Sequence, residues 1–150
     1  MEQELTYKDY LRPLKLAIFF SVLGEAAIFL IWGMLLFPEG NLIHKFLWTV
    51  IFCGLGMGAT VGAIIALFVV GRWKGLQAIV LCAELSGIVL GLFCNYLCYN
   101  LDMHFGYFGG KEVPLLFVIN GMVLAILGGS LVGWFCFSEK GKRILNKYNI

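Results

Sequence analysis

The sequence predicts an all-α membrane protein, a bundle of four transmembrane helices. The chain is 61% hydrophobic and only 13% charged, whereas a soluble domain usually carries about 25% charged residues. Four uninterrupted apolar runs each reach the roughly 20 residues that a helix needs to cross the hydrocarbon core. Because these runs are continuous rather than alternating, helices are favoured over the strands of a barrel.

The four predicted helices cover about residues 16–37, 46–70, 76–98 and 115–137. The first run is too long for the apolar core of a signal peptide, and no small-x-small cleavage site follows it. Residues 37–41 predict a tight loop. We therefore interpret residues 1–150 as a single membrane domain that ends in a basic tail, residues 138–150, lying along an anionic membrane surface.

The distribution of basic residues predicts the orientation of the chain. Nine of the eleven Lys and Arg residues lie before the first run, between the second and third, or in the tail, and only Lys45 and Lys111 lie in the other two loops. Basic loops stay on the cytoplasmic side. We expect a multi-pass integral protein with both termini in the cytoplasm, in the plasma (inner) membrane. The net charge of +2 comes from these membrane flanks, so no nucleic-acid partner is expected.

Two glutamates, Glu25 and Glu84, lie near the middle of the first and third runs. An ionisable side chain at bilayer depth is costly, and it usually faces the bundle interior or a wet cavity and marks a functional site. Glu25 follows Ser21 at a four-residue step, and Glu84 lies three residues before Gly87, so both are expected to point toward helix contacts. Each is about 12–15 Å from the cytoplasmic end of its run, which predicts similar depths.

A carboxyl removed from water favours its neutral form, and two neighbouring carboxyls can share one proton. Such a pair suits a proton relay or a cation site. The predicted ion- or proton-binding set is Glu25, Glu84, Asn120, Ser21 and Ser86. In the competing interpretation, each glutamate is protonated and hydrogen-bonded within the packing, or pairs with a basic residue of another subunit.

Small residues recur at four-residue steps on three of the predicted helices. They are Gly54, Gly58, Gly62 and Ala66; Gly87 and Gly91; and Gly121, Ala125, Gly129 and Gly133. Such rows let another helix backbone approach closely, within the chain or from another subunit. The glutamates and the rows recur in both halves, which suggests two parallel helical-hairpin repeats related by an axis along the membrane normal.

Other chemistry has little support in the sequence. No nucleophile has a base placed by a recognised motif, so no enzyme is expected. The five cysteines form no C-x-x-C pair, which argues against a disulfide framework, and no cofactor is predicted. His44 and His104 lie toward the outer side, His104 near cysteine and methionine in the sequence, and are weak candidates for copper binding.

The function that these features favour is transport of an ion or small solute with intramembrane carboxylates. The alternative is a non-catalytic accessory subunit of a larger membrane complex, with the small-residue rows as docking faces. A weaker alternative is membrane copper handling through the two histidines. The expected partners are the lipid bilayer and either further copies of the chain or other membrane subunits.

Overall fold

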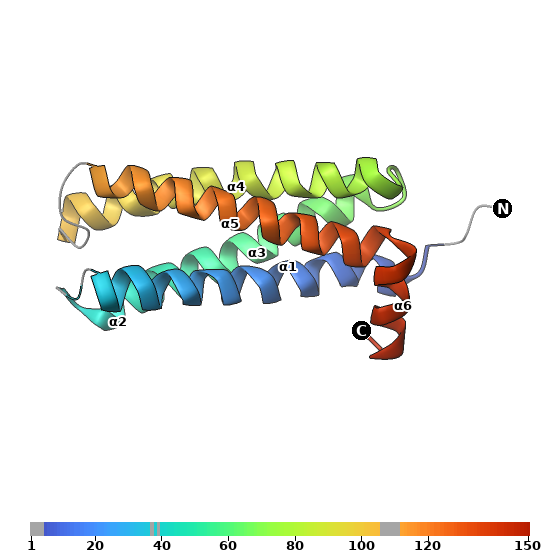
Figure 1. Cartoon of the computed structure of the whole chain (residues 1–150), viewed down its shortest axis with the longest axis horizontal. Coiled ribbons are helices and arrows are strands. Elements are labelled where there is room, and N and C mark those ends of the chain that lie inside the picture. Colours follow the sequence, from blue (N-terminus) through green and yellow to red (C-terminus); the bar gives the residue numbers. More distant parts are fainter. Residues whose placement is uncertain (1–4, 37, 39, 106–111) are drawn as a thin grey trace.

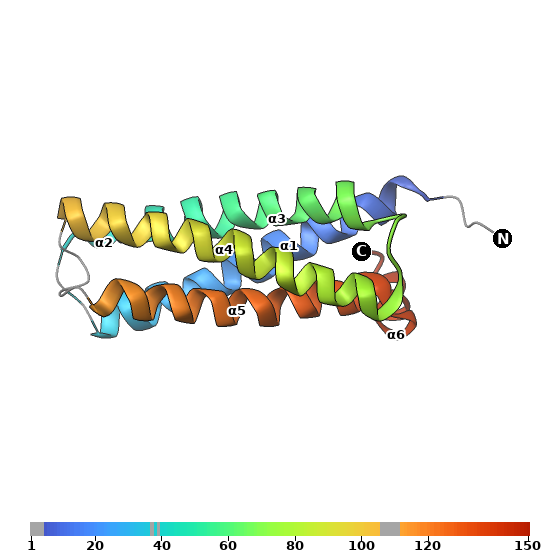
Figure 2. The ribbon, with the colours of Figure 1, turned by 90° about the horizontal axis from the view of Figure 1, so that it is seen from above.

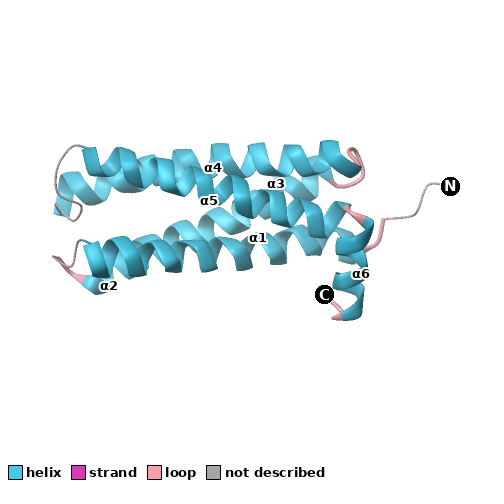
Figure 3. Cartoon of the chain, in the orientation of Figure 1, coloured by secondary structure: helices cyan, strands magenta, loops and turns pink. Residues whose placement is uncertain are grey.

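A computed structural model describes residues 5–36, 38, 40–105 and 112–150, without the side chains of residues 94, 95 and 97–118. Every element in the described part of the chain is a helix (Figure 3), which confirms the all-α prediction. Four helical stretches are long and apolar enough to span a membrane: Tyr7–Leu36, Leu42–Val69, Gly75–Phe93 and Ile119–Phe137.

The first hairpin alternates between α-helix and π-helix. Its elements, in chain order, are α1 (Tyr7–Ile28), η1 (Phe29–Leu36), α2 (Leu42–Phe46), η2 (Leu47–Met57), α3 (Gly58–Ile64) and η3 (Ile65–Val69). Helix α1 begins at Tyr7, earlier than the predicted residue 16, because the Asp9 carboxylate accepts the Thr6 backbone N–H at 2.9 Å and caps the first turn. The π-helical segments lie inside the apolar runs, where hydrophobicity alone could not reveal them.

The second hairpin consists of two long α-helices, α4 (Gly75–Phe105) and α5 (Glu112–Phe137). Helix α4 extends beyond the predicted end at residue 98. The backbone of His104, a residue that the sequence places beyond the end of the third predicted helix, therefore belongs to α4. Polar residues end an apolar run without ending a helix, because a helix that emerges from an apolar layer still satisfies its own backbone hydrogen bonds.

The glycine row of the first hairpin lies directly against the backbone of α1. A Cβ added to Gly58 would come within 2.8 Å of the Ile18 Cα, and one added to Gly62 within 2.6 Å of the Leu14 Cα. Gly54 faces Val22 in the same way. As the row advances by four residues, its partners on α1 step back by four, which is the register of two antiparallel helices in close contact.

The second hairpin is packed through small residues from both of its helices. A Cβ on Gly133 of α5 would come within 2.9 Å of the Ile79 Cα, and one on Gly129 within 2.7 Å of the Cys82 carbonyl oxygen. In the other direction, Gly87 and Gly91 of α4 accommodate side chains of α5. Ala66, Gly121 and Ala125 complete the rows; the last two are buried. The repeat relationship between the hairpins stays a prediction.

The two hairpins lie side by side along one long axis (Figures 1 and 2). The N-terminal end of α1, the turn that connects η3 to α4, and the C-terminal helix α6 (Glu139–Lys147) lie at the same end of the bundle. Helix α6 runs across that end, and its buried Leu145 packs into the core cluster. Lys8 donates to the Asn149 side chain at 3.2 Å, and Arg12 hydrogen-bonds the Asn146 side chain. The two ends of the described chain are thus joined.

Candidate functional site

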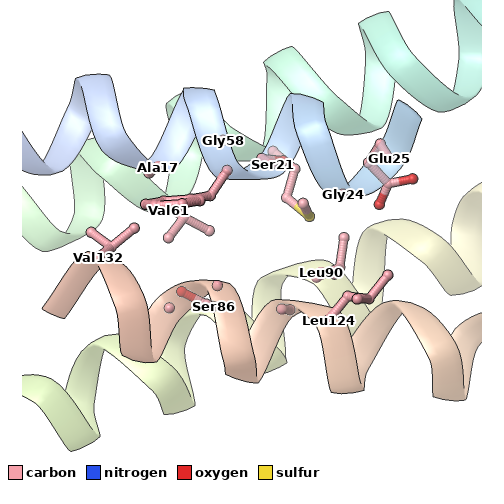
Figure 4. Close-up of a pocket in the computed structure, with 15 residues that line it drawn as sticks. Ala17, Ser21, Gly24, Glu25, Gly58, Val61, Ser86, Leu90, Leu124 and Val132 are labelled. Carbon is pink, nitrogen blue, oxygen red and sulfur yellow. The ribbon is translucent and has the colours of Figure 1, made fainter. Parts of the chain in front are cut away.

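A cavity of about 50 Å³ lies between the two hairpins, and Glu25 is the acidic residue in its wall. The side chain of Glu25 is 2% exposed. Ala17, Ser21 and Glu25 follow one another at four-residue steps on α1, so they share the helix face that turns toward the cavity (Figure 4). The sequence pattern of α1 is what aims this carboxyl inward.

All four long helical stretches contribute to the cavity wall. Figure 4 places α1 and α3 on one side and α4 and α5 on the other. Ser86 and Leu90 come from α4, whereas Leu124, Ala125 and Val132 are among the residues from α5. Apart from Glu25, the side chains with polar groups in the wall are Ser21 and Ser86. The rest of the lining is apolar or glycine.

The two serines present their oxygens differently. Ser86 is buried, and its hydroxyl donates to the Cys82 carbonyl one turn earlier at 2.7 Å. Since a hydroxyl has one hydrogen, the lone pairs of Ser86 Oγ can only accept from, or coordinate, whatever enters the cavity. The buried Oγ of Ser21 makes no hydrogen bond within the described part of the chain. The cavity therefore combines an acidic group with hydroxyl oxygens.

Glu84 is not part of this cavity. Its side chain is exposed in a separate groove of about 360 Å³ between α4 and α5, which it shares with Gly87 and Ser130. The expected proximity to Gly87 is present, but this side of α4 faces outward. Cys82 and Ser86, both turned inward, lie two residues from Glu84, which is about 200° around the helix. Within one copy of the chain, the two carboxyls do not form the expected pair.

The depths of the two glutamates also differ. In Figure 4, Glu25 lies beyond Ser86, in the direction of Leu90. Glu84 precedes Leu90 by six residues, or about 9 Å of helix, so it lies closer to the end that carries α6. Counting from the start of each apolar run gave similar depths because it could not detect how the two hairpins are shifted along the bundle axis.

Asn120, the remaining member of the predicted polar set, is exposed on α5 and does not line the cavity. The structure thus brings together Glu25, Ser21 and Ser86, and leaves Glu84 and Asn120 outside.

Lys45 is a buried charged residue that the sequence placed in a loop. Its side chain is 1% exposed, and its Nζ donates to the Gly33 carbonyl at 3.2 Å. Asn41 caps α2 by accepting the Ile43 backbone N–H at 2.9 Å, so Lys45 already lies within the helix. In the sequence, the signal for the start of this helix was Asn41, a residue type that commonly caps a helix N-terminus. Lys45 joins η1 to α2 at the end of the bundle opposite α6.

The described residues add no metal-binding arrangement around His44 or His104. His44 is exposed in α2, whereas the side chain of His104 and those of Cys94 and Cys98 lie outside the description. Cys53, Cys82 and Cys136 are buried free thiols. Among the described residues, no group of three His, Cys, Asp or Glu could hold a metal ion.

Comparisons with protein-family models, with curated proteins and with solved structures find no match to this chain. The fold and the cavity therefore define its class: an all-helical bundle with four helices long and apolar enough to cross a membrane, and a carboxyl buried between two hairpins.

Proposed function

We propose that this chain spans a membrane four times and moves protons or a small cation across it, with Glu25 as the group that binds the transported charge. One observation carries the proposal: a carboxyl that is 2% exposed lines a cavity between the hairpins. Ionisable residues within transmembrane segments are rare, and they mark ion pathways and proton relays.

The size and chemistry of the cavity support a small cation. A volume of about 50 Å³ accommodates only a few water-sized particles, since one water needs roughly 10–15 Å³ measured in the same way. Most organic solutes are too large. A carboxylate and the oxygens of Ser21 and Ser86 suit a hydronium or a bare monovalent cation, whereas an anion would meet no cationic side chain in the cavity wall.

The orientation is a further part of the proposal. The end of the bundle with α6 carries Lys8, Arg12 and the basic residues of the tail. If short basic segments stay on the cytoplasmic side, this end faces the cytoplasm, and the plasma (inner) membrane is the expected location. Lys45 and the N-terminal end of α5 would then lie on the outer side.

The accessory-subunit alternative loses its main support. It relied on small-residue rows that could dock a partner, but Gly54, Gly58, Gly62, Gly129 and Gly133 are all covered by helices of this chain. The copper alternative rests on two histidines of which only His44 has a described side chain. Neither alternative has an observation in its favour comparable to the burial of Glu25.

The test is ion flux into liposomes that contain the purified chain. A membrane potential drives uptake, a pH-sensitive dye reports protons, and parallel assays follow sodium and potassium. Glu25→Gln, which keeps the shape but not the ionisable group, is expected to reduce flux at least tenfold, or about 1.4 kcal/mol of barrier. The matched control is Glu84→Gln, which changes the same side chain outside the cavity and is expected to conduct within about twofold of the wild type.

Wild-type flux in Glu25→Gln would overturn the proposal. Helix content and particle size in detergent must match the wild type for either variant to count. If Glu25→Gln does not fold, Glu25→Asp provides the second variant, because it keeps a carboxyl in the cavity on a shorter side chain. Flux retained in Glu25→Asp and lost in Glu25→Ala would support the proposed role of the carboxyl, and equal flux in both would contradict it.

A further inference from the structure

Helix α6 lies across the end of the bundle rather than along its axis. Figure 1 shows it running at a steep angle to the long axis of the four apolar stretches. The change of direction occurs at Ser138, whose extended backbone (φ −93°, ψ 149°) ends α5, and whose hydroxyl oxygen accepts the Gly141 backbone N–H at 3.0 Å and caps α6. In a membrane that the bundle spans, such a helix lies roughly in the membrane plane.

The bundle fixes the rotation of α6 about its own axis. Gly141 and Leu145, four residues apart, are buried, and Leu145 belongs to the core cluster. Asn146, about 100° further round the helix, accepts a hydrogen bond from Arg12 of α1. One side of α6 therefore faces the core and the neighbouring side faces α1.

The side of α6 opposite to α1 carries exposed apolar residues. Ile144 and Tyr148 lie about 100° and 60° from Leu145, in the direction away from Asn146. The Tyr148 backbone N–H donates to the Ile144 carbonyl at 3.2 Å, so Tyr148 continues the helical turn. Ile144 is 39% exposed and Tyr148 is 66% exposed. The apolar face of α6 thus extends beyond the part that the bundle covers.

A row of cations borders this apolar face. Lys140, Arg143 and Lys147, spaced by three and four residues, are all exposed and lie roughly opposite Leu145; we call them the basic row. The Lys147 Nζ lies 5.7 Å from the centroid of the Tyr148 ring, where the two faces meet. The ion pair found among the described residues lies within α1, so in that part of the chain the basic row has no carboxylate partner. Its charge is complementary to an anionic ligand.

Exposed aromatic residues mark the level of a membrane interface at this end of the bundle. They are Tyr10 of α1, Trp73 of the turn before α4 and Trp134 in the last turn of α5. Trp and Tyr collect where acyl chains meet headgroups. Trp134 precedes Ser138 by four residues, or about 6 Å of helix, so α6 begins about one turn from this level.

We propose that α6 is an interfacial helix that binds acidic phospholipids. Ile144 and Tyr148 enter the boundary between headgroups and acyl chains, and the basic row binds the anionic headgroups. A phospholipid fits better than a nucleic acid or an acidic peptide, because it offers apolar chains and negative charge side by side, as the two faces of α6 require. The inference rests on the proposed membrane location, but not on transport through the Glu25 cavity.

The first arm of the experiment measures contact between α6 and acyl chains. Ile144→Cys is labelled with a fluorophore in liposomes of phosphatidylcholine and phosphatidylserine that contain a lipid with a quencher near the top of one acyl chain. The matched control is Glu139→Cys, an exposed position of α6 about 140° away round the helix. The unsubstituted chain gives the background from the native cysteines.

We expect quenching at position 144 to exceed that at position 139 about threefold, because an interfacial helix places one face among the acyl chains. Tyr148→Cys is the second position on the apolar face and should behave like Ile144→Cys. Equal quenching on both sides of the helix would overturn the inference. Each variant must match the helix content of the wild type.

The second arm tests the preference for acidic headgroups. Energy transfer from the label at Ile144→Cys is compared for a trace of acceptor-labelled phosphatidylserine and for the same trace of acceptor-labelled phosphatidylcholine, each in neutral liposomes. We expect transfer to phosphatidylserine to be about threefold higher. Replacing the three residues of the basic row by Gln should remove this preference.

The matched control removes the same number of exposed charges outside α6, with Lys15→Gln, Arg72→Gln and Lys74→Gln combined. This variant should keep most of the preference. An equal loss in both triple variants, or no preference in the wild type, would contradict the inference, since the attraction would then not come from α6.

Two further outcomes separate the possible failures. A chain that floats with liposomes but shows no quenching at position 144 would overturn the interfacial helix and leave the membrane location intact; a soluble acidic partner would then be the occupant of the basic row. A chain that does not float with liposomes would overturn both proposals. Quenching and headgroup preference as expected, without ion flux, would support the role of α6 and count against the Glu25 cavity alone.

Discussion

Glu25 and Glu84 occupy similar places in the sequence and opposite places in the fold. Each lies near the middle of an apolar run, yet Glu25 is buried between the hairpins and Glu84 is exposed in an outer groove. The difference comes from the position of each glutamate relative to the packing residues of its own helix. Glu25 is four residues from Ser21 and shares its face, whereas Glu84 is two residues from Cys82 and Ser86 and lies on the opposite side.

The two environments show that the direction of a side chain follows from its spacing to the packed residues of its own helix, whereas position along an apolar run gave neither its direction nor its depth. Both hairpins bring glycines against a neighbouring backbone, but they use different neighbours. In the first hairpin, the glycine row on η2 and α3 faces α1. In the second hairpin, glycines of α5 pack against α4, and glycines of α4 pack against α5. The packing rows therefore determine which side chains turn inward, and the largest effects should follow from disturbing them.

Adding a methyl group to a packed glycine should have the largest effect. Gly58→Ala would place its Cβ 2.8 Å from the Ile18 Cα, and overpacking of this kind costs about 1–3 kcal/mol. Gly133→Ala, with 2.9 Å to the Ile79 Cα, should cost a similar amount in the second hairpin. Thermal unfolding in detergent, followed by circular dichroism, measures both.

The matched control is Gly56→Ala, in the same helical stretch Leu42–Val69 as Gly58, where an added Cβ meets nothing within 4 Å. A change at such an open site usually stays within about 0.5 kcal/mol. If Gly58→Ala were as stable as Gly56→Ala, the close approach of α1 to the glycine row would be wrong, and so would the inward direction of Glu25 derived from it.

A smaller substitution tests whether the volume of the cavity contributes to ion flux. Gly24 lines the cavity, and an added Cβ would meet no atom within 4 Å. Gly24→Ala should therefore fold normally while occupying part of the volume, and we expect ion flux to fall about threefold, or roughly 0.6 kcal/mol of barrier. Gly56→Ala adds the same methyl group outside the cavity and should conduct like the wild type. Equal flux in the two variants would argue that the cavity does not lie on the conduction path.

The smallest expected effect is a difference in ion flux between the alanine variants of two serines with the same local geometry. Ser86 in the cavity and Ser130 in the outer groove each donate to the carbonyl four residues earlier at 2.7 Å. Removing the hydroxyl should lower flux about twofold for Ser86→Ala and leave it unchanged for Ser130→Ala, a difference of about 0.4 kcal/mol. The same flux assay measures both. A larger loss in Ser130→Ala than in Ser86→Ala would assign the conduction path to the outer groove.

Much of the architecture could be predicted from the sequence, because hydrophobic length and charge spacing act locally. The four apolar helical stretches and the absence of strands in the described ranges follow from composition and continuity. The π-helical segments could not be predicted, because apolar side chains are compatible with either helix type. The outward direction of Glu84 was missed because Gly87, three residues later, packs against Ile126 of α5, whereas Glu84 lies at the edge of this contact in an outer groove.

Lys45 was missed for a different physical reason. A single basic residue beside an apolar run is consistent with a solvated loop, whereas the cap at Asn41 and the hydrogen bond from Lys45 to the Gly33 carbonyl place it inside the fold. Ser21 and Ser86, which the sequence grouped with Glu25 in one polar set, line the same cavity as Glu25, whereas Glu84 and Asn120 of that set do not. Tertiary contacts join residues that are far apart along the chain, so local periodicity does not reveal them.

The contacts between α6 and α1 bear on the order in which the chain folds. Each hairpin consists of helices adjacent in sequence and can form as soon as its own residues are available, whereas Lys8 and Asn149 are 141 residues apart. Contacts of such long sequence separation generally form late. Protection of α6 from an added protease would therefore report completion of the whole bundle, and its appearance after protection of the hairpins would mark the last step of folding.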